Sequence, residues 1–476
     1  MGGGIRLKAW KRPLALCLGL AGFLLVYYGP AWPAVQDPMA GDVLLSSAGR
    51  GALGIFFLAV IWWLFEVLPV GVTSLAIGSL QVLFAIRPAK ATFNDFMDPS
   101  VVFIFAALII GTVFTKTGLT RRLAYRMLLI AGERTRVILL GSYVVTLLMT
   151  HVMAHSAVAV TIFPVLVTIY SLYGDLNQPS RFGKALFIGM AYVAGAGSVV
   201  TLLGAARGPV ALGLYQQITG QQISFLQLTA RLAPIGWIMV LLLWGYFCLV
   251  LPPERDRIVG LRKRVLDLHR RQGPLTWRQG LAALTVFVAF GLMSLQSIVP
   301  ALAQLDRAAL LLLTTLVFFI FKVLDLQDLE EVPWNIVLLF GGAMSLGQCL
   351  WQTGAAQWLA LSWLSWTQDL GPFIFLIALA GFVLIITNMI MNVAAIAISL
   401  PVALVVAPYL NFPTEAVVYV SLAAAGMPFL SLVGAAPNAI AHLSKQFTSA
   451  EFFRYGIVPT IMLLGLISLA LKTLWL

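Results

Sequence analysis

The chain has 476 residues, of which 61% are hydrophobic and 10% are charged, and this balance excludes an ordinary soluble globular protein. Its formal net charge of +12 would suggest a nucleic-acid partner in a soluble protein, but here the basic residues gather in short loops between apolar runs. Together with three cysteines that lack metal-binding spacing, this predicts a multi-pass membrane protein with no nucleic-acid partner, metal site or redox role.

The N-terminus carries four basic residues before the first apolar run, which covers residues 14–28. They are Arg6, Lys8, Lys11 and Arg12. Signal peptides and signal anchors share this layout, but the apolar run is long for a cleaved signal. We therefore expect a retained first helix with a cytoplasmic N-terminus, in a bacterial inner membrane.

Three more apolar runs follow at about residues 51–69, 70–86 and 101–117. Glu66 lies in the turn between the first two, and we interpret it as a structural cap and not as an ion ligand. The third run ends at Lys116-Thr-Gly118, a helix C-terminal signal. Residues 120–136 combine five Arg and one Glu with apolar residues. They predict an amphipathic helix on the cytoplasmic surface.

A polar notch separates the apolar runs at residues 137–153 and 157–173. The notch contains Thr150, His151, His155 and Ser156. Polar groups are costly in hydrocarbon, so such a notch is a functional-site candidate. The two runs are either two full spans or a re-entrant hairpin with the notch at its tip; Pro164 and the polar tip favour the hairpin.

A helix from about residue 184 is then interrupted at Gly204-Ala-Ala-Arg207-Gly208-Pro209, where the Gly and Pro content indicates an unwound segment. Another helix is predicted at about residues 232–251. The segment that follows, residues 253–279, is rich in Arg and is therefore expected to be a cytoplasmic linker between two halves of the chain.

The second half repeats this layout. Apolar runs lie at about residues 280–298, 307–324, 336–352 and 453–474. Residues 355–370 occupy the place of the basic helix but carry one charge, Asp369, and three tryptophans, which favours the opposite membrane face. A second notch runs from Thr387 through Asn392 to Pro401, and a second broken helix lies at Gly434-Ala-Ala-Pro437-Asn438.

These matches predict an all-α polytopic membrane protein with about eleven transmembrane helices plus two re-entrant hairpins in two inverted repeats. The expected segments are residues 1–47 (N-terminal segment, first helix and loop), 48–252 (first repeat), 253–279 (linker) and 280–476 (second repeat). Two polar interruptions at corresponding places are the best sequence indication of the midplane site of a secondary transporter.

The chain resembles the divalent anion/sodium symporter family, whose members carry dicarboxylates, tricarboxylates and sulfate. The resemblance covers nearly the whole chain from about residue 48. It rests on Trp62-Trp-Leu-Phe-Glu-Val-Leu-Pro69, Pro99-Ser-Val-Val-Phe-Ile-Phe, Lys116-Thr-Gly-Leu, Val332-Pro-Trp-Asn-Ile-Val-Leu-Leu-Phe-Gly-Gly342 and Gly434-Ala-Ala-Pro-Asn-Ala-Ile440. The resemblance implies a homodimeric carrier that works by elevator-type alternating access, through exchange or through proton or sodium coupling.

In that family each hairpin tip bears Ser-Asn-Thr and each broken helix a Gly-Thr-Pro-Pro-Asn-like sequence, which bind substrate carboxylates and two sodium ions. Here the tips read Ala154-His155-Ser156 and Met391-Asn392-Val393, and Arg207 and Gly208 replace Pro and Asn in the first break. By matching position, the expected substrate-binding residues are His155, Ser156, Arg207, Asn392, Val393, Pro437 and Asn438. The expected cation-binding residues are Thr150, Gly204, Thr387, Asn392 and Ala435.

We hypothesise that His155 and Arg207 replace the first sodium ion by charge, so that the only cofactor is one sodium ion at the second site. Arg grips carboxylate or sulfate oxygens with two parallel hydrogen bonds, and His can add proton coupling. The alternatives are that Arg207 snorkels to an interface or neutralises Glu66, and that His155 is a packed, hydrogen-bonded histidine.

Other functions remain open from the sequence alone. A cation/proton or arsenite-type carrier would share this architecture, but such carriers rely on intramembrane acids, which are nearly absent here apart from Glu66. The altered tips also allow a transport-inactive membrane scaffold. An enzyme is not expected, since no paired acids, nucleophile elbow or metal cluster is visible.

Overall fold

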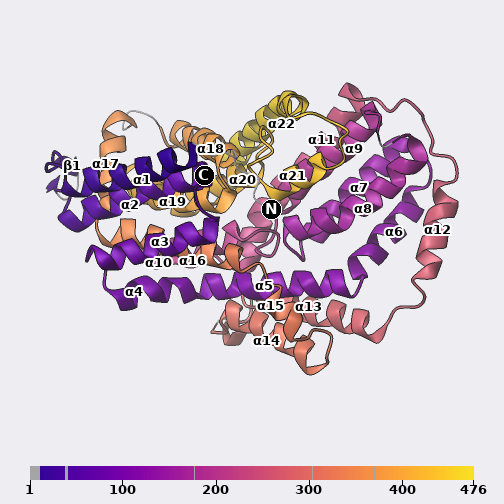
Figure 1. Cartoon of the computed structure of the whole chain (residues 1–476), viewed down its shortest axis with the longest axis horizontal. Helices are drawn as coiled ribbons and strands as arrows, with labels where there is room; N and C mark the ends of the chain where they lie inside the picture. Colours follow the sequence, from indigo (N-terminus) through magenta and orange to yellow (C-terminus); the bar gives the residue numbers. More distant parts are fainter. Residues whose placement is uncertain (1–10, 38–40, 176, 303, 368–370) are drawn as a thin grey trace.

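The computed structural model describes residues 11–37, 41–175, 177–302, 304–367 and 371–476, and nearly all of its regular structure is helical (Figure 1). The described strands are β1 (Val35–Asp37) and β2 (Gly41–Val43), which form a short antiparallel ribbon. The first helix, α1 (Lys11–Tyr28), matches the first predicted run. Arg6, Lys8 and Asp369 lie outside the described residues.

The other predicted runs also form helices. Those outside the two hairpins are α2 (Ser47–Leu64), α3 (Val70–Leu83), α5 (Pro99–Lys116), α9 (Arg181–Gly197) with α10 (Arg207–Thr219), α11 (Phe225–Val250), α13 (Trp277–Leu295), α14 (Arg307–Ile320), α16 (Trp334–Gln352), α20 (Thr414–Gly426) with α21 (Ala436–His442), and α22 (Ser449–Ala470). Among the described residues, nine helices are long and apolar enough to cross a membrane. The expected all-α polytopic fold is confirmed.

Two helical hairpins stand where the polar notches were found. The first consists of α7 (Thr135–Thr150) and α8 (His155–Tyr173), and the second of α18 (Pro372–Met389) and α19 (Asn392–Tyr409). Each hairpin packs against the broken helix of its own half, α9 or α20 (Figure 1). The halves also exchange contacts, because α21 packs on α8 and α9 while α10 packs on α19. The hairpins and broken helices therefore form one packed group at the centre of the fold.

Corresponding helix ends in the two halves have the same conformation. After α3, Ala85 has a φ of 49°, and after α14, Lys322 has a φ of 52°. In each case a following N–H returns to the preceding helix, from Ile86 to Gln81 O and from Val323 to Phe318 O. The helices α5 and α16 likewise both end before a Thr-Gly pair whose glycine has positive φ. These matches support an internal repeat, while its boundaries and membrane orientation stay predictions.

Short helices flank the spans. They are α4 (Ala89–Asn94), α6 (Leu119–Ala131), α12 (Leu261–Arg271), α15 (Leu326–Glu330) and α17 (Ala355–Thr367). The helix α6 falls in the predicted amphipathic segment. By contrast, α12 lies inside the linker, where no helix was predicted, and it packs along α6 at one end of the molecule (Figure 1). The side chain of Arg122 joins the two, donating to the carbonyls of Gln272, Gly273 and Pro274.

The linker is also fastened to the ends of the first hairpin and of α9 by Glu254. Its carboxylate accepts hydrogen bonds from the backbone N–H groups of Arg181 and Phe182 and from the Tyr173 hydroxyl, at 2.5, 3.3 and 2.8 Å. Burial opposes ionisation, but these hydrogen bonds outweigh it and lower the pKa of Glu254 from its ordinary value of 4.5.

Replacing Glu254 with Gln is expected to destabilise the protein at neutral pH but not in acid. Because the pKa is lowered by folding, the ionised carboxylate adds stability above the unfolded-state value of 4.5, and this stability is lost as the pH falls through the lowered folded value. The gap in unfolding temperature between wild type and Glu254→Gln in detergent should therefore shrink below pH 4.5. Glu330→Gln, at an exposed carboxylate, is the control. A gap of constant size would contradict the prediction.

Candidate functional site

The tip of the first hairpin is held by the unwound segment between α9 and α10. The backbone N–H of His155 donates to the Gly204 carbonyl at 2.9 Å, and its ring Nδ1 lies 3.2 Å from the same oxygen. Since a carbonyl only accepts, Nδ1 carries the proton in this arrangement. The Thr201 hydroxyl donates to the His151 carbonyl at 2.7 Å. His155 is thus a hydrogen-bonded part of the contact between tip and break.

The two residues expected at the first cation site lie against each other. A Cβ at Gly204 would approach the Thr150 carbonyl oxygen to 2.6 Å and Ser198 backbone atoms to 2.7 Å, so only glycine fits. The Thr150 hydroxyl is fully buried and donates to the Leu147 carbonyl at 2.6 Å. The structure therefore brings Thr150 and Gly204 together, but the Gly204 carbonyl already accepts from His155.

The second hairpin meets its break in the same way. A Cβ at Gly434 would lie 2.6 Å from the Thr387 carbonyl oxygen, and the Thr387 hydroxyl donates to the Ala425 carbonyl at 3.1 Å. Ala435 follows as the residue before α21. Asn392 begins α19 and is 6% exposed, yet no hydrogen bond is found for its amide within the described residues. Thr387 and the segment containing Ala435 are therefore adjacent in the fold.

Asn438, in the first turn of α21, supports the second unwound segment, which is residues 427–435. Its amide nitrogen donates to the carbonyls of Pro428 and Ser431, at 2.9 and 2.8 Å. Pro437 stands in the first turn of α21, where proline needs no N–H partner. The Asn438 amide thus supports the loop backbone, a role that the matched position alone did not indicate.

Asn388 ties the second hairpin to its break, although sequence reasoning assigned it no role. Its Oδ1 accepts from the Leu430 N–H at 2.9 Å and its Nδ2 donates to the Leu384 carbonyl at 2.8 Å. The sequence did contain a signal, since Asn388 follows Thr387 as His151 follows Thr150. His151 itself packs edge-on against Trp237, with ring centroids 5.9 Å apart.

Arg207 is the first residue of α10 and is only 1% exposed. Its Nη2 donates to the Ser198 hydroxyl at 2.8 Å, across the unwound segment, and its Nη1 is buried with no hydrogen-bond partner among the described residues. A Cβ at Gly426 would lie 2.6 Å from Nη2, so the guanidinium reaches the end of α20. This burial excludes snorkelling to an interface, and no ion pair with Glu66 is present in the described part of the chain.

The remaining expected substrate residues lie beside these groups. Ser156 follows His155 in the first turn of α8 and is partly exposed, whereas Val393 follows Asn392 in the first turn of α19 and is buried. The expected site residues of the first half lie around the break at residues 198–206, and those of the second half lie around the break at residues 427–435. The arrangement places a positively charged side chain, Arg207, at the first break and uncharged oxygen atoms that could bind a cation at the second.

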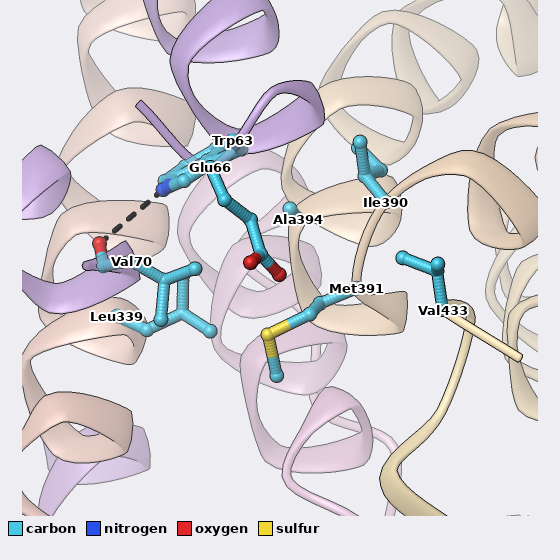
Figure 2. Close-up of a pocket in the computed structure, with 8 residues that line it drawn as sticks. All are labelled: Trp63, Glu66, Val70, Leu339, Ile390, Met391, Ala394 and Val433. Atoms are coloured by element: carbon cyan, nitrogen blue, oxygen red, sulfur yellow. Dashed lines mark hydrogen bonds between the residues drawn. The ribbon is translucent and has the colours of Figure 1, made fainter. Parts of the chain in front are cut away.

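A pocket beside the second hairpin tip contains Glu66 (Figure 2). It is lined by Trp63, Glu66, Val70, Leu339, Ile390, Met391, Ala394 and Val433, and its cavity volume is only about 10 Å³. Glu66 has a φ of 44°, a left-handed conformation that favours glycine. Its carboxylate makes no hydrogen bond to a helix end in the described residues, so the expected capping role finds no support. The sequence showed the charge but not the surface that it faces.

Comparison with known proteins places this architecture among membrane carriers. The family model described as "Sodium:sulfate symporter transmembrane region" matches residues 39–476. The sodium-dependent dicarboxylate transporter SdcS of Staphylococcus saprophyticus is 23% identical over 426 residues, covering 83% of this chain and 80% of that protein. SdcS of Staphylococcus aureus is 24% identical, with coverage of 86% and 85%. A membrane protein of Cupriavidus necator is 25% identical, with coverage of 90% and 88%.

Two solved structures share the fold. MtrF of Neisseria gonorrhoeae, described as one of a class of antimetabolite efflux pumps, has a TM-score of 0.61 and 13% sequence identity, covering 99% of this chain and 96% of that one. The YdaH transporter of Alcanivorax borkumensis has a TM-score of 0.59 and 13% identity, with coverage of 98% and 97%. At this identity the likeness concerns the fold alone.

Proposed function

Since this chain belongs to the sodium:sulfate symporter family, as its motifs predicted, we propose that it is a secondary active transporter of divalent anions. The substrate class is a dicarboxylate, a tricarboxylate or sulfate. The sodium-dependent dicarboxylate transporters among its relatives support a carboxylate substrate. The family is one of transport proteins and not of enzymes.

The observation that carries the proposal is the buried guanidinium of Arg207. A buried donor without an acceptor costs about 1–3 kcal/mol, and a charged one costs more. Nη1 is such a donor, because it has no hydrogen-bond partner among the described residues, whereas Nη2 donates to the Ser198 hydroxyl. A carboxylate or sulfate oxygen that enters when the first tip moves would satisfy Nη1 and neutralise the charge. This explains why a positive charge is kept at the break without an acidic partner.

We propose that the first sodium site is replaced by His155 and Arg207. The Gly204 carbonyl, which stood at the expected cation site, is used by the two N–H groups of His155. A hard cation needs several free oxygen ligands. The second break keeps the Thr387 hydroxyl oxygen, and the Asn392 amide beside it has no hydrogen bond within the part of the chain that the structure describes, so one sodium ion is proposed there.

The proposed mechanism is elevator-type alternating access. The hairpins and broken helices of both halves pack on one another, which supports their movement as one body. Between states, this body would carry the anion from one membrane face to the other while the remaining helices stay fixed. The homodimer, the cytoplasmic N-terminus and the bacterial inner membrane remain predictions of the sequence.

The test is uptake of labelled succinate, citrate and sulfate into proteoliposomes. A sodium gradient, a proton gradient and internal counter-substrate are imposed separately. The proposal expects saturable uptake of at least one of these anions and a sodium dependence that fits one site. Two sodium ions per cycle would contradict the replacement of the first site, and no uptake or binding of any anion would favour the inactive scaffold.

A further inference from the structure

The end of the molecule formed by α6 and α12 has no role in the proposed anion site, and it carries an excess of positive charge. Residues 119–136 hold five Arg and one Glu, and residues 253–279 hold eight basic and three acidic residues. We propose that an outward basic face at this end binds the anionic headgroups of phospholipids in the adjoining leaflet of the membrane. The basic face consists of Arg126 of α6 with Lys263 and Arg270 of α12. This inference does not depend on which anion the protein carries.

The helix α12 is held at the level of the membrane surface. Figure 1 shows it at one end of the molecule, crossing the direction of the long span α5. Five residues, 272–276, separate it from Trp277, where the span α13 begins. Before its other end, the Ile258 N–H donates to the Glu133 carbonyl at 2.9 Å, close to the start of α7. The helix α12 is therefore attached at both ends to segments that enter the membrane.

The side chains of α12 divide into a buried and an outward side. Leu261 and Val265, four residues apart, are buried. Lys263 and Arg270, seven residues apart, lie on the opposite side of the helix and are exposed, with the exposed Leu266 between them. An outward side that combines basic residues with an exposed apolar one is typical of helices that lie in the membrane interface.

The exposed side of α6 has the same combination. Leu123 and Ile130 are exposed, Ile130 to 79%, and Arg126 lies between them, three residues from one and four from the other. In lipid, such an Arg keeps its stem in the apolar region and extends its guanidinium to the headgroups. Since α6 and α12 pack along each other, their basic side chains are presented together at headgroup level.

Three of the four acidic side chains in these two segments are used by contacts within the protein. The Glu133 carboxylate accepts from the Gly260 N–H at 3.1 Å. Asp267 pairs with Arg271 at 3.0 Å. Glu254 accepts from backbone N–H groups at the start of α9. These carboxylates are therefore not free to neutralise the basic face.

The basic face itself has no partner within the part of the chain that the structure describes. The side chains of Arg126, Lys263 and Arg270 form no hydrogen bond or ion pair there. Asp256, the fourth acid, is exposed and precedes α12, and one carboxylate cannot neutralise three basic groups. The face therefore fits an anionic partner from outside the chain.

A phospholipid fits this face better than a soluble anion. Its phosphate supplies the negative charge and the acceptor oxygens that Lys and Arg need. Its acyl chains also cover the exposed Leu266 and Ile130 beside the basic residues, which a soluble anion would leave in water. Clusters of basic residues on amphipathic helices next to a span are the usual sequence sign of binding to anionic lipids.

The test is a titration of the purified full-length protein in neutral detergent with phosphatidylglycerol, followed by the unfolding temperature. Phosphatidylglycerol should raise this temperature in wild type more than phosphatidylcholine does, and added salt should reduce the difference. Each basic residue removed from the face should raise the lipid concentration for half-maximal stabilisation about fivefold. Arg126→Gln/Lys263→Gln/Arg270→Gln should therefore raise it roughly a hundredfold. Equal stabilisation of wild type by the two lipids would overturn the proposal.

A matched pair of single variants locates the effect. Lys263 and Lys90 are both exposed on short helices, but Lys90 belongs to α4, at the other end of the molecule (Figure 1). Lys263→Gln should shift the titration and Lys90→Gln should not. Arg126→Lys/Arg270→Lys keeps both charges and should titrate close to wild type. If the triple variant is unfolded without lipid, these variants decide. Equal shifts in Lys263→Gln and Lys90→Gln would refute the assignment, as would equal stabilisation by soluble inorganic polyphosphate.

Discussion

Arg207→Gln is expected to abolish high-affinity transport of the anion while leaving a folded protein. Arg207 is 1% exposed and has a free N–H donor, so an anion bound there is desolvated and receives a charge-assisted hydrogen bond. Loss of one partner from such a buried pair costs about 2–5 kcal/mol. The apparent affinity should then fall by roughly 30-fold to several thousand-fold. It is measured as the concentration dependence of anion exchange in proteoliposomes.

Two further variants separate charge from shape at this position. Arg207→Lys keeps the charge but loses the planar fork, so it should recover only part of the affinity. Arg262→Gln removes a positive charge from the exposed linker helix α12 and should leave the affinity unchanged. If Arg207→Gln unfolds the protein, the thermal transition in detergent will show it. Unchanged affinity in folded Arg207→Gln would remove Arg207 from the anion site.

Gly204→Ala is expected to disrupt the first hairpin tip and with it transport. The added Cβ would lie 2.6 Å from the Thr150 carbonyl oxygen and 2.7 Å from two Ser198 backbone atoms. These neighbours are backbone, so the tip must move away from the break. Overpacking of this kind costs about 1–3 kcal/mol, occasionally more. The move would also stretch the hydrogen bond from the His155 N–H to the Gly204 carbonyl.

The matched control is Gly245→Ala in α11, where nothing lies within 4 Å of the added Cβ. In a helix interior this change should be neutral or stabilise by about 0.5–1 kcal/mol. The unfolding temperature in detergent and the rate of anion exchange are measured for both variants. If Gly204→Ala retains wild-type exchange, the close approach of tip and break is not needed for transport.

The position of the first break shows what could and could not be predicted from the sequence. The Gly and Pro residues predicted a break at 204–209, but the unwound segment is residues 198–206 and α10 begins at Arg207. Pro209 is accepted in the first turn of a helix, because an N–H is not needed there. Within the unwound segment, the Thr201 hydroxyl donates a hydrogen bond to the His151 carbonyl of the first hairpin tip. The Gly and Pro content predicted the region of the break, but it did not predict which residues are unwound.

The sequence by itself determined the membrane class, the spans and the two hairpins. In hydrocarbon every backbone polar group must be satisfied within the protein, so long apolar runs become helices and polar interruptions mark the tips. Only the tertiary structure decided what the polar residues face. Glu66 and Met391 are far apart in the chain yet line one pocket, and Arg207 reaches Gly426 of the other half. These contacts between distant residues depend on how the two halves pack against each other, and a local sequence pattern cannot predict that packing.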